Sequence, residues 1–301
     1  MKKPIVISLT TNDNDYQLEQ AESAKEAGQR LNIDLQILYA ENDAVLQSQQ
    51  LLRIIQSDPD SRPAGIIFEP VGGTAMPQVA KAAATAGIAW VVLNREVNYI
   101  SELRQNYNVP IFSISSDHQE IGRMQGMQLA ALLPNGGSAL LIQGPSENSA
   151  AKQRTAGMYE TKPAAIQIKL MKANWTEASA HRTVSSWLKL STSKQTPVDV
   201  IAAQDDSMAL GARKAFEEIT DSATRERWLR LPFLGIDGVS KTGQAWVNQG
   251  LLTATIVVPA NAGKAIEMLA QAVLTGNMPA GMTLIPTRSY PPLEDLAKRR
   301  S

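Results

Sequence analysis

The sequence predicts an α/β protein with two doubly wound parallel-sheet lobes. Short apolar, β-branched segments alternate with amphipathic helical stripes along nearly the whole chain. The alternation stops once, at a polar and irregular stretch over residues 95–110, and then begins again. Near-continuous apolar strands separated by helices are typical of parallel sheets that are buried on both faces. With 301 residues, the chain is long enough for two domains with separate cores.

The first half contains four predicted strands, at residues 5–9, 33–38, 65–68 and 90–93. Apolar residues at helical spacing predict a helix over residues 13–31, and similar stripes predict helices over 45–55 and 79–86. The pair Gly72-Gly73 marks a turn between two of these elements.

The second half repeats the pattern. Strands are predicted at residues 139–142, 166–170, 198–201, 233–236 and 254–258, and helices, including one over 149–159, lie between them. Each half therefore forms its own sheet, with strand tips that can face the other half.

Composition limits the function. Lysine plus arginine equals aspartate plus glutamate at 29 each, which gives no support for binding nucleic acid or a membrane surface. The absence of cysteine excludes disulfides and thiol chemistry. No apolar run approaches the ~20 residues of a membrane span. The lysines near the start precede an apolar segment too short for a signal peptide, so either a signal was removed or the protein stays in the cytosol.

Polar side chains follow most of the predicted strands. Ligands of open parallel sheets bind beyond the carboxyl ends of the strands, so these side chains are the candidates for a binding site. They are Asn12, Asp13, Asp15, Tyr16, Glu69, Asn94, Arg95, Gln143, Arg154, Trp175, Gln204, Asp205 and Asp237. Carboxylates and amides accept hydrogen bonds from hydroxyls, arginine donates in a planar fork, and an aromatic face covers the apolar face of a sugar.

Each candidate also has a structural interpretation. Asp13, Asp15 and Asp205 could cap helices. Glu69 could be a solvated charge at a strand end, and Arg154 a surface residue of its helix. The remaining two alternatives are a core position for Trp175 and a turn position for Asp237 before Gly238.

Motifs for catalysis are missing from the sequence. His118 and His181 have no metal-ligand spacing and are expected on helix surfaces. No phosphate-binding loop or nucleophile elbow is present. The adjacent Asp205 and Asp206 give only a weak signal for Mg²⁺, because neighbouring residues at a helix start point in different directions. No cofactor or bound metal is expected, and an enzyme is the least favoured function.

Six motifs in order resemble the periplasmic sugar-binding proteins of the ribose-binding type, which have the type I periplasmic binding fold. The resemblance covers residues 4–287. The motifs lie at residues 6–16, 92–95, 115–122, 143–154, 203–211 and 235–238.

The resemblance implies ligand contacts from both lobes. Carried over by position, they are Asp13, Asp15, Tyr16, Asn94, Arg95, Arg154, Trp175, Asp205 and Asp237. Tyr16 and Trp175 would sandwich the sugar ring, the two arginines would donate, and Asp205 and Asp237 would accept.

The chain departs from the ribose-type pattern at four places. It has Asn94-Arg95 where the family has Asp-Arg, and Asp205-Asp206 where the family has Asn-Asp. Asp15-Tyr16, with two extra residues before it, stands where the family has paired aromatics, and Val258 stands where the family has a glutamine near the last crossover. Ribose itself is therefore disfavoured. Four candidate carboxylates against two arginines also disfavour a phosphate or a sugar acid, and favour a neutral polyol or an amino sugar.

The family fold further implies a hinge of three crossovers between the lobes, near residues 113–116, 257–259 and 285–287. The N-lobe is expected to comprise residues 1–114 and 259–286, and the C-lobe residues 115–258 and 287–301. The resemblance implies a monomer that closes on a small neutral sugar or polyol and delivers it to the membrane permease of an ABC transporter in the periplasm. The alternative is a sugar-sensing module without transport, acting through a sensor kinase or transcriptional control. Direct DNA binding is not expected.

Overall fold

The computed structural model describes residues 3–72 and 75–298, and the predicted turn residue Gly73 lies outside them. The chain forms two compact units. Unit 1 comprises Met1–Ser116 and Ala260–Ile285, and unit 2 comprises Asp117–Pro259 and Pro286–Ser301. The chain therefore passes between the units three times.

Unit 1 contains a six-stranded parallel sheet in the order β11-β5-β4-β3-β1-β2. Its strands are β1 (Ile5–Leu9), β2 (Leu35–Tyr39), β3 (Gly65–Phe68), β4 (Ala89–Leu93), β5 (Ile111–Ser116) and β11 (Met282–Ile285). Its helices are α1 (Asp15–Leu31), α2 (Ala44–Ile55), α3 (Pro77–Thr85), α4 (Ile100–Asn106) and α12 (Ala262–Thr275), with a 3₁₀ turn at Pro59–Ser61.

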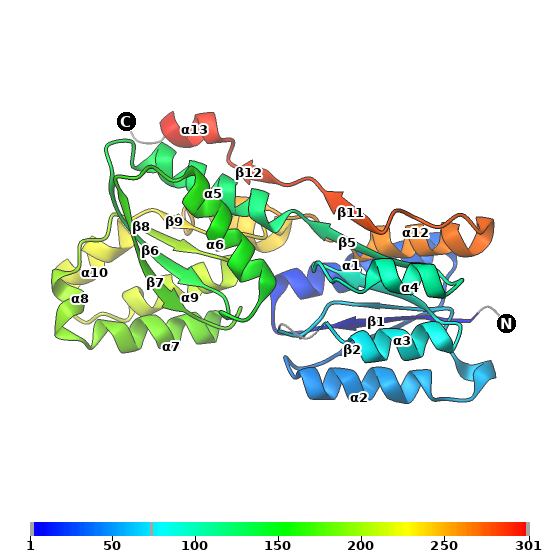
Figure 1. Ribbon diagram of the computed structural model, residues 1–301. Helices are drawn as coiled ribbons and strands as arrows, with labels where there is room; N and C mark the ends of the chain where they lie inside the picture. Colours follow the sequence, from blue (N-terminus) through cyan, green and yellow to red (C-terminus); the bar gives the residue numbers. More distant parts are fainter. Residues whose placement is uncertain (1–2, 73–74, 299–301) are drawn as a thin grey trace. The chain divides into compact units, whose positions relative to one another are not determined.

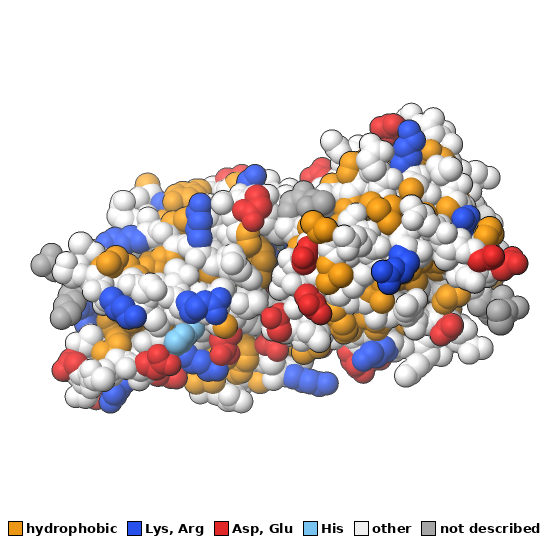
Figure 2. Space-filling view, turned by 90° about the horizontal axis from the view of Figure 1, so that it is seen from below, with side chains coloured by type: hydrophobic (Ala, Val, Ile, Leu, Met, Phe, Trp, Pro, Cys, Tyr) orange, Lys and Arg blue, Asp and Glu red, His pale blue; other side chains and the backbone are white. Residues whose placement is uncertain are grey.

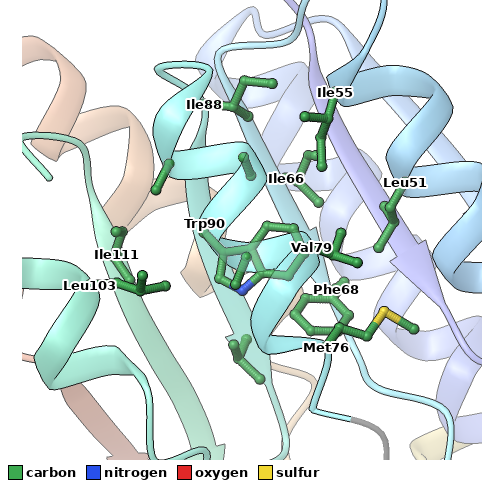
Figure 3. Packing of buried hydrophobic residues seen from close by; sticks show 14 of the residues in the cluster. Leu51, Ile55, Ile66, Phe68, Met76, Val79, Ile88, Trp90, Leu103 and Ile111 are labelled. Carbon is green, nitrogen blue, oxygen red and sulfur yellow. The ribbon is translucent and has the colours of Figure 1, made fainter.

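Both faces of this sheet are covered by helices (Figure 1). One face packs against α2, α3 and α4, where the Trp90 ring lies 4.5 Å from that of Phe68, measured between centroids (Figure 3). The other face packs against α1 and α12, where Ile266 and Leu269 are fully buried. Burial on both sides explains why the central strands β3 and β4 are continuous apolar runs in the sequence.

Unit 2 contains a four-stranded parallel sheet in the order β7-β6-β8-β9 and a separate two-stranded antiparallel sheet of β10 and β12. The strands are β6 (Gly137–Gln143), β7 (Ile166–Lys172), β8 (Val200–Ala203), β9 (Phe233–Leu234), β10 (Thr255–Val257) and β12 (Arg288–Tyr290). The helices are α5 (His118–Leu132), α6 (Ser149–Thr161), α7 (Glu177–Leu188), α8 (Ser191–Gln195), α9 (Asp206–Glu217), α10 (Ser222–Leu229), α11 (Ala245–Asn248) and α13 (Leu293–Lys298), with a π-helical turn at Ser240–Gln244.

Unit 2 also has a core on each face of its sheet. Side chains of α7, α9 and α10 pack on one face, where the Phe216 and Trp228 rings stack with centroids 4.8 Å apart. Side chains of α5, α6 and α13, including Met158 and Leu296, cover the other face. The prediction of parallel sheets covered by helices is confirmed. The strand predicted at 254–258 is present as β10, but its antiparallel pairing with β12 is not indicated by the alternation of strands and helices.

The stretch 95–110, predicted to be irregular, contains α4. Its short apolar stripe is Ile100 and Leu103, which are both buried, and seven residues are too few for periodicity to stand out from the sequence.

The surface agrees with the balanced composition. Lysine and arginine side chains lie among aspartate and glutamate side chains on the face shown in Figure 2. Within the described residues, no helix is both long and apolar enough to cross a lipid bilayer.

Candidate binding site

In unit 1, a buried hydrogen-bonded network surrounds the carboxylate of Glu69, directly after β3. The Oε2 atom accepts hydrogen bonds from Gln17 Nε2 at 2.9 Å and from Asn94 Nδ2 at 3.0 Å. The Oε1 atom lies 3.8 Å from an Nη atom of Arg95, which follows β4. Glu69 is only 4% exposed, so its interpretation as a solvated charge is wrong. Its burial is possible because it has both amide donors and a cation as partners.

The same network extends to α1 and α12. The Tyr16 hydroxyl accepts from Asn94 Nδ2 at 3.2 Å, and Asn94 Oδ1 accepts from Asn261 Nδ2 at 2.6 Å. Gln20 donates to Asn261 Oδ1 at 2.9 Å and accepts from the Asn261 backbone N–H. Sequence reasoning missed Gln17, Gln20 and Asn261. Gln20 lies one turn after Tyr16 on the buried side of α1, a position where a polar residue among alanines is a signal.

The two aspartates before α1 have a different setting. Asp13 is exposed and accepts a hydrogen bond from the Thr11 hydroxyl, while Asp15 is the first residue of α1 and partly exposed. The helix is capped by Asn14, whose side chain accepts from the Tyr16 and Gln17 backbone N–H groups. The capping interpretation is therefore wrong for Asp13 and Asp15.

In unit 2, Arg154 occupies the centre of the strand-end cluster. The guanidinium donates to the backbone oxygen of Gln204, lies 3.9 Å from Asp237 Oδ1, and stands 5.6 Å from the ring centroid of Trp175. Arg154 is 6% exposed, so its interpretation as a surface residue is wrong. The helix α6 has no marked apolar face, and the sequence therefore does not reveal that this position points inward.

The Gln204 side chain connects three segments beneath this cluster. Its Oε1 accepts from the Gly144 N–H at 3.1 Å, and its Nε2 donates to the Ala151 backbone oxygen at 3.1 Å and to Thr155 Oγ1 at 2.9 Å. Gln143 also donates to Thr155 Oγ1, at 2.6 Å. These bonds hold the ends of β6 and β8 against the start of α6.

Trp175 and Asp205 complete the cluster. The partly exposed Trp175 indole rests against Gly144, and a Cβ atom at that position would overlap the ring. Asp205 is 2% exposed and caps α9 by accepting from the Met208 N–H at 2.5 Å, which confirms the capping interpretation for this residue.

Three of the nine predicted site residues have strained backbones. Asn94, Trp175 and Asp237 have φ angles of 55°, 60° and 113°, among seven non-glycine residues with positive φ in the described part of the chain. Such conformations persist only where the surrounding structure enforces them, and they concentrate at functional sites.

The described residues contain no group of three histidine, cysteine or acidic side chains that could hold a metal ion. The carboxylate of Asp206 instead accepts hydrogen bonds from within unit 2. Both histidines lie on helices, but only His181 is partly exposed; His118 is 5% exposed, so its predicted surface position is wrong.

Each unit thus presents its own cluster of buried polar groups at the carboxyl ends of parallel strands. Direct contacts join Tyr16, Asn94 and Arg95 in unit 1, and Arg154, Trp175 and Asp237 in unit 2. Together these clusters contain carboxylates, guanidiniums, amides and an aromatic face. This set suits a ligand rich in hydroxyl groups, because a hydroxyl both donates and accepts.

Curated proteins with similar sequences carry names of sugar- and polyol-binding proteins. A putative rhizopine-binding protein of Rhizobium meliloti is 31% identical over 62% of this chain and 58% of its own length. A D-ribose/D-allose-binding protein of Pseudomonas aeruginosa is 26% identical over 71% of this chain and 66% of its own length. A xylitol-binding protein of Mycolicibacterium smegmatis is 27% identical over 69% of this chain. The matched segments cover less than two thirds of the length of each of these three relatives, 54% in the last.

Solved structures share the fold. A periplasmic solute-binding protein of an ABC transporter from Actinobacillus succinogenes, with bound D-allose, superposes with a TM-score of 0.81 at 21% identity, covering 99% of this chain and 100% of its own. The binding protein of an arabinose ABC transporter from Shewanella sp. ANA-3 superposes with a TM-score of 0.80 at 22% identity, covering 99% of this chain and 95% of its own. Both likenesses show the type I periplasmic binding fold.

The model of the periplasmic binding protein domain matches residues 5–278, nearly the whole chain. That family is periplasmic, and its members bind solutes and catalyse no reaction. The chain therefore belongs to the periplasmic binding protein family.

Proposed function

We propose that the protein binds one small neutral sugar or polyol with the strand-end clusters of both units. The observation that carries the proposal is the pair of clusters itself, one on each unit, each built from buried polar groups around an arginine. Charge-assisted hydrogen bonds contribute ~1.5–3 kcal/mol each where the partners are buried. A few of them suffice for micromolar binding, about −8 kcal/mol.

Each cluster offers a different part of the recognition. In unit 2, Asp237 accepts from a hydroxyl, Arg154 donates to an oxygen, and the partly exposed ring of Trp175 covers an apolar ring face. In unit 1, Glu69 pairs with the guanidinium of Arg95, which donates to a ligand oxygen, and the Asn94 amide supports this arrangement through its hydrogen bonds to Glu69 and Tyr16. The ligands in the names of relatives support this class of compound, since they include ribose, allose, xylitol and apiose.

The mechanism that we propose is a population shift. A ligand binds more tightly to a conformation in which both clusters contact it than to one in which only one cluster does. It shifts the population toward the first conformation by the difference between these two affinities. Closure about a hinge is the general behaviour of periplasmic binding proteins. The ligand-bound form would then deliver the ligand to the permease of an ABC transporter in the periplasm.

A sensing role without transport is the second candidate. One solved structure with this fold, at a TM-score of 0.78 and 21% identity, is the fructose-binding periplasmic domain of a hybrid two-component system. Ligand uptake and ligand-induced transcription, both measured in a deletion strain, separate the two roles. Loss of uptake of the radiolabelled ligand supports transport, whereas normal uptake with loss of ligand-induced transcription supports sensing.

The binding proposal is tested by thermal shift and calorimetry with D-ribose, D-allose, L-arabinose, xylitol, myo-inositol and D-glucosamine. Binding of at least one compound is expected. Arg95→Lys in unit 1 and Asp237→Asn in unit 2 should each weaken it by at least about tenfold, the loss of one charged hydrogen bond. The exposed Glu226→Gln serves as the control. If only one of the two substitutions weakened binding, a ligand shared by both clusters would be contradicted. If no compound of the panel bound, the proposed function would be contradicted.

The aromatic contact has its own test. Trp175→Ala should weaken the binding of ring-shaped ligands more than that of the linear xylitol, because only a ring presents a flat apolar face to the indole. Equal losses for both kinds of ligand would remove the stacking contact from the proposal.

A further inference from the structure

Asp206 has a buried carboxylate that joins the start of α9 to two other segments of unit 2. Its Oδ2 accepts from the Gly238 backbone N–H at 2.7 Å, and its Oδ1 accepts from Thr255 Oγ1, also at 2.7 Å. Asp206 is 3% exposed. Hydrogen bonds of this length to a carboxylate are among the stronger ones in proteins.

The backbone is shaped to admit this carboxylate. A Cβ atom at Gly235 would overlap Oδ1, and a Cβ atom at Gly243 would overlap Oδ2. Gly235 and Gly243, one before and one after the turn, therefore leave room for the carboxylate. One of the carboxylate oxygens accepts the hydrogen bond from Gly238, which lies within that turn.

The residue inside this turn is Asp237, whose φ angle of 113° is rare for a residue with a side chain. Its backbone N–H donates to the Ile256 oxygen at 3.0 Å, and its own oxygen accepts from the Val258 N–H at 2.9 Å. These two bonds hold the backbone of Asp237 against β10. The bond that the Gly238 N–H donates to Asp206 holds the same turn against the start of α9.

We propose that Asp206 is a positioning residue, which holds the turn in the conformation that directs the Asp237 carboxylate toward Arg154. The inference rests on the proposed function only where it concerns the ligand. The competing explanation is that Asp206, as the first residue of α9, serves only the positive end of the helix.

A double-mutant cycle in the protein without ligand separates the two explanations. Asp206→Asn keeps the shape of the side chain but loses charge, and it is made in the natural background and in an Asp237→Gly background. Glycine adopts positive φ without strain, so the turn no longer needs to be held. We expect the fall in melting temperature caused by Asp206→Asn to be clearly smaller in the glycine background. Equal falls in both backgrounds would assign Asp206 to the helix alone and overturn the proposal.

Hydrogen exchange gives a second measurement on the same bond. In the unaltered protein, the Gly238 amide should be protected although it lies outside regular secondary structure, and Asp206→Asn should accelerate its exchange by about tenfold or more. Asp221→Asn, which alters an exposed carboxylate at the start of α10, should leave Gly238 unchanged. A Gly238 amide that is unprotected in the unaltered protein would overturn the proposal even if the variant failed to fold.

Binding of D-allose or myo-inositol as probes completes the test. Asp206→Asn should weaken binding at least tenfold in the natural background and add nothing in an Asp237→Ala background, because it acts through Asp237. Equal weakening in both backgrounds would overturn this part. If the unaltered protein binds no compound of the panel, the proposed function fails, while the cycle and the exchange data still decide the role of Asp206.

Discussion

The substitution Arg154→Ala tests the unit 2 cluster most directly, because it removes a buried cation from beside a buried carboxylate. The side chains of Arg154 and Asp237 are 7% and 11% exposed, so solvent screens the pair only weakly. Breaking a buried pair by removing one member costs about 3–5 kcal/mol. The hydrogen bond to the Gln204 backbone oxygen and the contact with the Trp175 ring are lost as well.

This free energy has a measurable thermal equivalent. For a domain the size of unit 2, each 1 kcal/mol lowers the melting temperature by about 2–4 °C, so Arg154→Ala should lower it by about 6–20 °C. Differential scanning calorimetry without ligand measures the loss. The control is Arg230→Ala, which removes an exposed pair with Glu226 at 3.0 Å, with side chains 79% and 63% exposed. An exposed pair of this kind contributes about 0.5 kcal/mol or less.

Two outcomes would refute this reasoning. One is a melting temperature for Arg154→Ala within about 2 °C of the unaltered protein, the range that an exposed arginine gives. The other is a loss as large for Arg230→Ala. A partial recovery in Arg154→Met with Asp237→Asn, where neither charge remains, would instead support the pair, because the penalty comes from the carboxylate left alone.

Three further predictions concern both units. In unit 1, Glu69→Ala should destabilise the fold by about 3 kcal/mol because it leaves buried Arg95 without its carboxylate. Glu69→Gln should cost less because it keeps an oxygen that accepts from Gln17. Urea denaturation measures the free energy of unfolding of both variants, and equal losses of stability would contradict the role of the network. Gly144→Val should displace the Trp175 indole, shift the fluorescence of that tryptophan and abolish sugar binding while the far-ultraviolet circular dichroism stays unchanged; an unaltered emission spectrum would show that the ring does not rest there. Burial raises the pKa of Tyr99, so the stability contributed by its neutral form is complete below the usual tyrosine pKa of about 10 and is lost as the pH rises above that value. In Tyr99→Phe, the free energy of unfolding should therefore fall less steeply with alkaline pH. Identical dependence of stability on pH in the two proteins would contradict the prediction.

Much of the fold follows from local patterns. The strands β1 and β4 each have five consecutive buried residues; β4 is an uninterrupted apolar run in the sequence, and β1 is interrupted only by Ser8. The cap of α9 by Asp205 could be anticipated because the free N–H groups at a helix start need a partner, whereas α1 is capped by Asn14 and not by Asp13 or Asp15. The helix α4 was not predicted, since about two turns of helix offer too few periodic positions.

The site was only partly predictable. That Asp205 and Asp237 follow strands is visible in the sequence, because parallel strands end at one edge of a sheet. That Glu69 is buried is not, because burial depends on amide donors from α1 and a guanidinium after β4, far away along the chain. The same holds for Arg154, whose helix has polar and small residues on every side.

The sequence by itself determined the alternation of strands and helices, the positions of the strand ends and the kinds of polar group gathered there, since these depend on local periodicity and on residue type. Only the tertiary structure decided which of those groups are buried and which partners they have. Asp206 shows the difference: in the sequence it is one of two adjacent acids at a helix start, and in the fold its carboxylate holds a glycine N–H next to Asp237 and a threonine on β10. The physical reason is that desolvation and hydrogen-bond geometry are set by atoms that are distant in the chain and become neighbours only when the sheets assemble.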